Sequence, residues 1–266
     1  MEYIDINGGR IAYELAGPSR GEVVLLSHSL FFDHSMFAPL AERLHEAGYR
    51  TLAYDHRGQG ASSRAAREEL SVDALAEDAA ALVTALDLGP VHAVGNSLGG
   101  FVTLRLAARH PEALRTVAAL GASAEEEYQL AAFAPLAEAL GQDGGAAIHV
   151  ETLLHIMFGD TSLAGENTVV DHWRTYMSQL GPSIGDAAYQ VIHRGRIYEE
   201  LEGVTVPVLA IAGDEDHAYP QPISGSNIAA ATGGREETVA RAGHSVALEQ
   251  PETVAHLLLT HFKQSA

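Results

Sequence analysis

The sequence of 266 residues contains no cysteine. A chain without thiols forms no disulfide, no zinc–thiolate site and no iron–sulfur cluster, and it offers no thiol nucleophile. Any chemistry that it performs must therefore come from hydroxyl, imidazole, amide or carboxylate groups.

Basic residues are also scarce in this chain. Lysine and arginine together number 16 against 35 aspartate and glutamate residues, which leaves a formal net charge of −19. A surface of that sign repels the phosphates of nucleic acids and of anionic lipids. We therefore expect no nucleic acid and no membrane among the partners.

Long hydrophobic runs are missing as well. No stretch approaches the roughly 18 uninterrupted apolar residues that a membrane-spanning helix needs. The amino terminus lacks the basic start and the apolar run of a signal peptide. These features predict a cytoplasmic protein, whereas the oligomeric state has no readable signature.

Hydrophobic residues nevertheless make up 47% of the chain, which is typical of a globular protein. Short β-branched runs alternate with longer alanine- and leucine-rich segments of helical period, a pattern that predicts parallel strands joined by helical crossovers. The expected fold class is α/β, with a mostly parallel central sheet flanked by helices. Strands are expected at 23–27, 51–54, 91–96, 117–120, 206–212 and 238–240, after an opening hairpin of 3–6 and 11–15. Helices are expected at 37–47, 73–86, 98–109 and 246–263.

The alternation of strands and helices stops after Gly121. About 80 residues follow without a convincing strand, and glycine and proline interrupt their alanine-rich helical patches. We interpret residues 123–202 as a helical cap, inserted into a core that is formed by residues 1–122 and 203–266.

The sharpest local motif is Gly95-Asn96-Ser97-Leu98-Gly99, which fits the pattern Gly-x-Ser-x-Gly. It lies between an expected apolar strand and an expected helix, and in this context the pattern forms a strained turn that exposes a nucleophilic serine. A helix that begins at Leu98 points its amide groups and the positive end of its dipole at the reacting oxygen. Ser97 is therefore the candidate nucleophile.

Together with three other passages, this motif resembles the α/β-hydrolase family over all of the chain except the inserted middle. The passages are Leu25–Leu30, which resembles the family's strand-then-His-Gly loop, Tyr54–Gly60, which resembles its Asp-x-Arg-Gly-x-Gly turn, and the terminal Gly243-His244. Ser97, Asp216 and His244 occur in the family's order of nucleophile, acid and histidine. The resemblance implies an α/β-hydrolase fold in which these three residues form a catalytic triad.

The chemistry of a serine nucleophile supports the same roles. A neutral hydroxyl is a weak nucleophile, so Ser97 needs a base within hydrogen-bond reach and a carboxylate that orients this base. His244 is the expected base and Asp216 the expected acid. Asp214 follows the same strand, but Asp216 has the longer reach along the loop and, by resemblance, the family's Gly-x-x-Asp spacing from Gly213.

Two backbone amides are expected to form an oxyanion hole. The negative charge on the substrate oxygen would meet the N–H of Leu98 and, by resemblance, that of Leu30. This loop departs from the family pattern, because Ser29 stands where glycine is usual. The sequence His28-Ser29-Leu30 resembles the loop of the enol-lactonase branch and points to lactones and small esters. The dehalogenase and epoxide-hydrolase branches are disfavoured, since they carry aspartate at the position of Ser97.

Fourteen histidines raise the question of a metal site, but the pattern His-Glu-x-x-His is absent and the histidines are scattered. The first apolar strand is not followed by the Gly-x-Gly-x-x-Gly of a dinucleotide site. We therefore expect no metal and no cofactor.

Two apolar clusters stand out in the cap. Trp173, Tyr176 and Met177 fall at helical spacing, and Met157 belongs to a second cluster. Such stripes either attach a cap to its core or line an apolar pocket above the nucleophile. These four residues are the candidate substrate-binding residues.

The motifs and the resemblance together predict a serine hydrolase that cleaves a carboxylic ester or lactone through an acyl-enzyme. The expected partner is a small apolar ester or lactone. Two alternatives stay open. One is a cofactor-free perhydrolase or carbon–carbon bond hydrolase on the same triad, and the other is a small-molecule sensor with a hydrolase fold. The acyl and alcohol groups cannot be read from the sequence, because fold does not fix function.

Overall fold

The computed structural model describes residues 1–265 and contains an eight-stranded sheet. The strands are β1 (Glu2–Ile6), β2 (Gly9–Ala16), β3 (Val23–Ser27), β4 (Arg50–Tyr54), β5 (Val91–Asn96), β6 (Leu114–Leu120), β7 (Val208–Gly213) and β8 (Arg235–Val239). Their order in the sheet is β1-β2-β4-β3-β5-β6-β7-β8. β2 runs antiparallel to β1 and β4, and all other neighbours are parallel. The expected mostly parallel sheet is confirmed.

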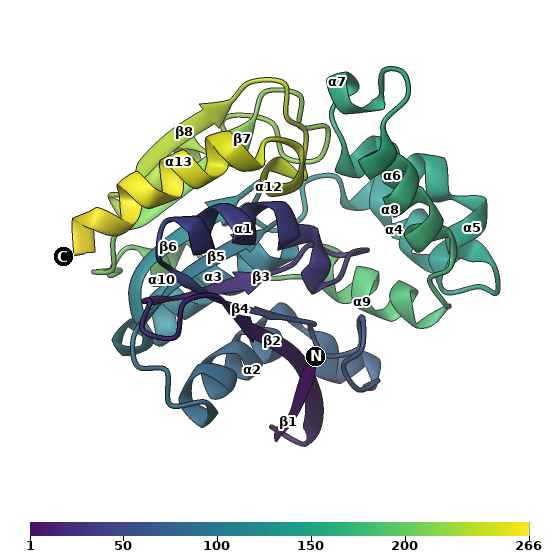
Figure 1. Ribbon diagram of the computed structural model, residues 1–266. Helices are drawn as coiled ribbons and strands as arrows, with labels where there is room; N and C mark the ends of the chain where they lie inside the picture. Colours follow the sequence, from purple (N-terminus) through teal and green to yellow (C-terminus); the bar gives the residue numbers. More distant parts are fainter. Residues whose placement is uncertain (266) are drawn as a thin grey trace.

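Helices cover both faces of this sheet, which is why its central strands are buried and mostly apolar. β3, β5 and β7 are buried along their whole length. On one face α1 (Ala38–Glu46) packs against α13 (Pro251–Phe262), and on the other α2 (Val72–Ala85) packs against α3 (Leu98–Arg109) (Figure 1). Right-handed crossovers place these two pairs of helices on opposite faces of the sheet. The chain passes from β3 to β4 in one direction along the sheet and from β5 to β6 in the other.

This reversal of direction lies between the neighbouring strands β3 and β5. The loops that leave their carboxyl ends diverge, and the crevice between such loops is the usual ligand site of an open α/β sheet. The loop after β3 carries Leu30 and the turn after β5 carries Ser97. The sheet topology therefore brings the two segments of the expected site together.

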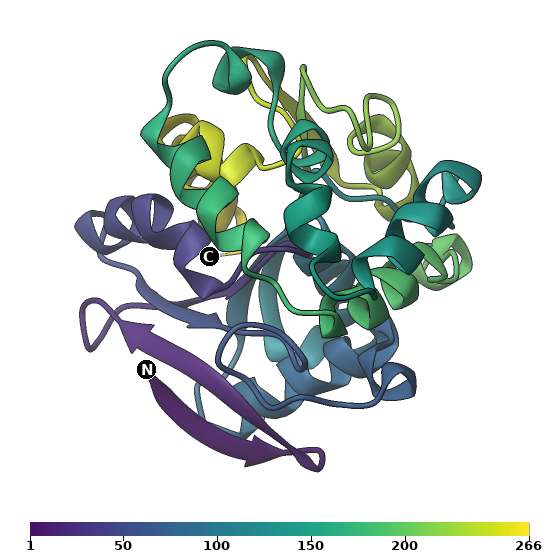
Figure 2. The ribbon, with the colours of Figure 1, turned by 90° about the vertical axis from the view of Figure 1, so that its right-hand side faces the viewer.

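The segment between β6 and β7 is helical. Its helices are α4 (Leu130–Leu140), α5 (Gly145–Ile148), α6 (Val150–Met157), α7 (Asp160–Leu163), α8 (Thr168–Ser178), α9 (Ser183–Ile192) and α10 (Tyr198–Leu201). Figure 1 shows α4–α9 gathered on one side of the molecule, and Figure 2 looks at that side, with the β1–β2 hairpin below. α10 instead packs against α3. The division into a core and a cap at residues 123 and 202 stays a prediction.

Two helical regions differ from the sequence expectation. The expected helix over 246–263 is divided into α12 (Val246–Glu249) and α13, because Pro251 disfavours the helical conformation in Gln250, which has φ −133° and ψ 58°. A helix that the sequence analysis did not assign, α11 (Ser226–Thr232), forms the crossover from β7 to β8. Short 3-10 helices lie at His34–Phe37, Arg67–Leu70, Pro111–Ala113 and Lys263–Ser265. No helix within residues 1–265 has the length and apolar character that crossing a bilayer requires.

Candidate active site

Ser97 occupies the sharp turn between β5 and α3. Its backbone angles are φ 53° and ψ −114°, a conformation that residues other than glycine rarely adopt. The turn forms because small neighbours let the backbones approach. A Cβ atom on Gly95 would lie 2.0 Å from the carbonyl oxygen of Gly99, and a Cβ on Gly99 would lie 1.8 Å from that of Ser27. The two glycines of the motif are therefore required by packing.

Three side chains meet at the carboxyl end of the sheet. His244 Nε2 lies 2.7 Å from Ser97 Oγ, and His244 Nδ1 lies 3.0 Å from Asp216 Oδ2. None of the three residues is more than 5% exposed. Because a carboxylate can only accept, Nδ1 carries the hydrogen, which leaves the lone pair of Nε2 directed at the serine hydroxyl. This geometry joins a hydroxyl, an imidazole and a carboxylate in one chain of hydrogen bonds, which is the arrangement that a serine nucleophile requires.

The loop after β7 distinguishes the two aspartates that the sequence offers. Asp216 Oδ1 accepts hydrogen bonds from the backbone N–H groups of Ala218, at 2.8 Å, and Tyr219, at 2.9 Å. Because Oδ2 contacts His244, both oxygens of the carboxylate are hydrogen-bonded. Asp214 is exposed, and within residues 1–265 its side chain accepts a single long hydrogen bond of 3.5 Å, from Ala242 N. The structure thus brings Asp216, and not Asp214, to the imidazole.

Two backbone amides near Ser97 are available to a substrate oxygen. The N–H groups of Leu30 and Leu98 donate no hydrogen bond within residues 1–265. Leu98 is the first residue of α3, and the amides of a first helical turn have no partner inside the helix. Ser29, which replaces the family's glycine, has no positive φ, and its hydroxyl donates to the carbonyl of Asn96 at 3.1 Å. The serine therefore ties this loop to the nucleophile turn.

Two buried histidines support the loop after β3 through hydrogen bonds. His28 Nδ1 donates to the carbonyl of Ser29 at 2.8 Å, and His28 Nε2 accepts the backbone N–H of His56 at 2.9 Å. Burial lowers the pKa of both imidazoles. The neutral form is needed here, because a protonated Nε2 has no lone pair with which to accept.

We expect the melting temperature to fall when the pH is lowered from about 7 to about 5. Burial lowers the pKa of four imidazoles, which are His28, His56, His92 and His261. Below about pH 6.5 the unfolded chain binds protons that the folded chain does not, so stability present above that pH is lost on acidification. The hydrogen bond to Asp55 raises the pKa of His34 and acts in the opposite direction. Melting curves by circular dichroism across this range test the sign, and a rise on acidification would contradict it.

An apolar cavity of about 60 Å³ opens beside Ser97 and His244. Leu30 and Phe31 line it from the core, and α4, α6 and α9 line it from the insertion. No lysine, arginine, aspartate or glutamate is among the described residues that line it. Tyr219 also lines the cavity, but its hydroxyl already donates a hydrogen bond to the carboxylate of Glu127. The cavity thus offers apolar contact and few polar groups besides those of the triad.

Of the four candidate substrate-binding residues, the structure brings only Met157 to this cavity. Trp173 and Met177 are buried on α8, and the Trp173 ring packs 4.6 Å from that of Phe32. Tyr176 stacks edge-on against Trp173, at 5.1 Å between ring centroids. The structure places these three outside the cavity beside Ser97, and their role as substrate-binding residues stays a prediction. Their helical spacing does mark a packed face, but this face attaches the insertion to the loop after β3.

Sequence reasoning missed the groups that hold the His244 loop. Asn96 Nδ2 donates to the carbonyl of His244 at 2.7 Å, and Asn96 Oδ1 accepts from Ala247 N at 3.3 Å. On the insertion side, the Met157 carbonyl accepts the N–H of Ser245 at 2.9 Å. Asn96 and His244 lie 148 residues apart, so no local pattern signals the contact.

A buried ion pair supports the loop that carries Asp216, and the sequence analysis missed this pair too. Arg194 Nη1 lies 3.1 Å from Glu127 Oε2, and its guanidinium lies 4.1 Å from the centroid of the Phe101 ring. Tyr219 donates to the same carboxylate, and its ring lies 5.3 Å from that of His244. Burial raises the pKa of Tyr219, so the hydroxyl keeps its proton. Breaking such a pair leaves an uncompensated buried charge.

Comparison with known proteins identifies the family of this chain. Residues 22–154 match the family model described as alpha/beta hydrolase fold. The chain belongs to the α/β-hydrolase family.

Several members of the α/β-hydrolase family are similar along most of their length. The 3-oxoadipate enol-lactonase 1 of Acinetobacter baylyi is 26% identical over 210 residues, which is 79% of this chain and 77% of that protein. A protein of Caulobacter sp. (strain K31) named "Putative carbamate hydrolase RutD" is 27% identical over 223 residues, 82% of this chain and 79% of that protein. The enol-lactonase from Burkholderia xenovorans LB400 superposes with a TM-score of 0.89 at 25% identity, covering 98% of this chain and 100% of that chain. The chain is thus a hydrolase of this family, with enol-lactonases among its relatives.

Proposed function

We propose that this α/β-hydrolase cleaves small uncharged esters or lactones through an acyl-enzyme on Ser97. The observation that carries the proposal is the apolar cavity beside the serine. A charged acyl group there would lose its hydration without gaining a partner. The cavity volume of about 60 Å³ is small for a ligand pocket, which suits short acyl groups.

The proposed reaction begins with attack on the substrate. Ser97 Oγ forms a bond to the carbonyl carbon while His244 Nε2 accepts the hydroxyl proton. The resulting oxyanion accepts hydrogen bonds from the N–H groups of Leu30 and Leu98. Asp216 keeps the imidazole in the required tautomer and stabilises the imidazolium that forms.

The second half of the proposed reaction releases both products. The carbon–oxygen bond to the alcohol breaks, the leaving oxygen takes the proton from His244, and the acyl group stays on Ser97. Water then gives a proton to His244 and attacks the acyl carbon, which releases the acid and restores the serine hydroxyl. With a lactone, the alcohol and the acid are parts of one product.

Charge distinguishes this substrate class from the lactone in the name of the enol-lactonase relative. A lactone made from a dicarboxylic acid such as an oxoadipate keeps one free carboxylate. The described residues that line the cavity include no lysine or arginine that would pair with it. We therefore favour neutral lactones and esters over the charged compound.

A substrate panel tests the proposed function. It contains p-nitrophenyl esters of increasing acyl length, neutral lactones, a carboxylate-bearing enol-lactone and a carbamate. We expect kcat/KM to be highest for neutral substrates with short acyl groups. A preference for the charged lactone or for the carbamate would contradict the proposal. Tight retention of a ligand with very slow turnover would favour a sensor instead.

We expect Met157→Ala to shift the preferred acyl length upward by about two carbons, because the truncated side chain enlarges the cavity. Met177→Ala is the matched control, since Met177 is also a buried methionine of the insertion but lies outside the cavity. Both variants should lose about 2–5 kcal/mol of stability. Only the first should change the ester profile, and equal shifts in both would contradict the assignment of the cavity.

A further inference from the structure

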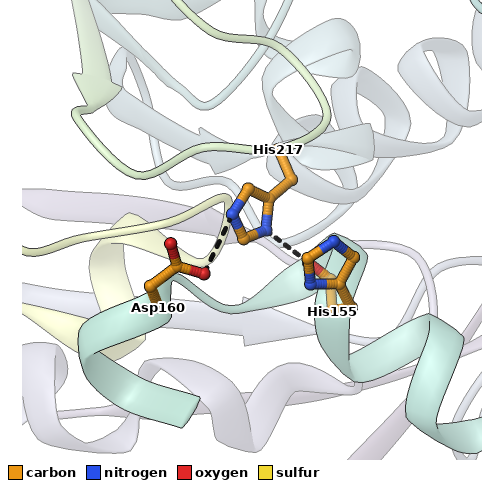
Figure 3. A group of neighbouring side chains, drawn as sticks. All are labelled: His155, Asp160 and His217. Atoms are coloured by element: carbon orange, nitrogen blue, oxygen red, sulfur yellow. Dashed lines mark hydrogen bonds and ion pairs between the residues drawn. The ribbon is translucent and has the colours of Figure 1, made fainter. Parts of the chain in front are cut away.

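Three side chains that can bind a metal ion meet on the surface where the insertion contacts the loop that bears Asp216. His155 belongs to α6, Asp160 begins α7, and His217 directly follows Asp216 in the loop after β7 (Figure 3). One nitrogen or oxygen atom from each of the three lies within 4.8 Å of the others. His155 and His217 are 62 residues apart, so the cluster forms no sequence motif.

The tautomer of His217 is fixed by a backbone contact. Its Nδ1 lies 2.7 Å from the carbonyl oxygen of His155, and because a carbonyl only accepts, Nδ1 must carry the hydrogen. In the neutral ring, the lone pair of Nε2 then faces Asp160 Oδ1, at 3.3 Å (Figure 3). A ring nitrogen lone pair and a carboxylate oxygen at this distance can both bind the same metal ion.

The geometry fits a zinc ion. Zinc binds imidazole nitrogen and carboxylate oxygen at about 2.0–2.2 Å, so two ligands of a tetrahedral site lie about 3.3 Å apart. Nε2 of His217 and Oδ1 of Asp160 have this separation. The bond from Nδ1 to a backbone carbonyl is the outer contact that metal-binding histidines usually make. The His155 ring stacks on that of His217 at 4.2 Å and is exposed, so it can rotate to supply the third ligand.

The segment that carries Asp160 is held in place by the core. Glu249 Oε2 accepts the N–H of Gly159 at 2.9 Å, and Glu215 Oε2 accepts the N–H of Thr161 at 2.6 Å. These two bonds fix the backbone on both sides of Asp160. The two ligands that already lie at the correct separation are therefore positioned before any ion binds, which favours a specific site.

We propose that His155, Asp160 and His217 bind one Zn²⁺ ion, with water as the fourth ligand. The ion would connect the insertion to the loop that bears Asp216, and it would act as a structural link. The proposal does not depend on the substrate of the enzyme, because none of the three residues lies in the triad or lines the cavity.

Calorimetric titration of Zn²⁺ into the chelator-treated full chain tests the site. We expect one ion to bind per chain, and we expect His155→Ala and Asp160→Asn each to weaken binding by at least about tenfold. His172→Ala is the matched control, since His172 is an exposed histidine of the insertion outside the cluster, and it should bind as the wild type does. Saturating Zn²⁺ should raise the melting temperature of the wild type and of His172→Ala, but not that of Asp160→Asn.

Two outcomes would overturn the proposal. If the wild type binds no Zn²⁺, the cluster is an ordinary surface contact between the three side chains. If the wild type and both ligand variants bind equally, the ion sits elsewhere on the chain. Neither readout measures hydrolysis, so the failure of this proposal is distinguishable from the failure of the proposed function.

Discussion

Ser97→Ala is expected to lower kcat by about 10⁴-fold or more while the fold stays intact. The variant keeps the apolar cavity and the amides of Leu30 and Leu98, but it lacks the oxygen that lies 2.7 Å from His244 Nε2. Alanine retains the small Cβ that the tight turn accommodates, so its melting curve should match that of the wild type. Steady-state kinetics and circular dichroism measure the two quantities.

An active-site-directed fluorophosphonate provides the control for this prediction. It should label the wild type and fail to label Ser97→Ala, because the phosphorus bonds to the nucleophilic oxygen. Equal labelling of both proteins would assign the nucleophile to another residue. His244→Ala should cost about as much in kcat as Ser97→Ala, since the two side chains act as a unit.

Asp216→Asn is expected to lower kcat by about 10⁴-fold, because an amide in place of the carboxylate favours the wrong tautomer of His244. The asparagine oxygen can still accept the N–H groups of Ala218 and Tyr219, so the loop should keep its shape. The variant therefore tests the charge and the acceptor at Oδ2, and not the fold of the loop.

Asp214→Asn is the matched control for this experiment. Its side chain is exposed and accepts the long hydrogen bond from Ala242 N. The change should therefore cost roughly 1 kcal/mol of stability and leave kcat within a few-fold of the wild type. Steady-state kinetics and melting temperatures of Asp216→Asn and Asp214→Asn test which aspartate orients His244. The reverse ranking in kcat would make Asp214 the catalytic acid.

The nucleophile turn was predictable from the sequence because its requirements are local. A serine in a strained turn needs small residues at positions 95 and 99, a buried strand before it and a helix after it. Residues that are adjacent in the sequence determine all of these features. His244 and Asp216 follow different strands, so their meeting depends on the sheet order, and the sequence pointed to them through the family resemblance.

The cavity and the histidine cluster were not predictable in the same way. Helical spacing shows that one face of α8 is buried, but it does not show whether that face meets the core or the substrate, and Trp173 meets Phe32. A motif search finds metal ligands that share a helix or a loop. The pair of His217 and Asp160 joins two separate segments, and its geometry exists only in the folded chain.

Met157 combines two tasks that involve different atoms. Its side chain lines the cavity, while its backbone carbonyl holds the amide of Ser245 beside the triad. Mutations that exchange the side chain therefore leave the supporting hydrogen bond in place, because every residue supplies the same carbonyl. Val191 and Ile192 on α9 line the cavity as well, and their apolar side chains make no hydrogen bond to the triad. Natural or laboratory evolution thus has a route to new acyl preferences through these positions that preserves the reaction machinery.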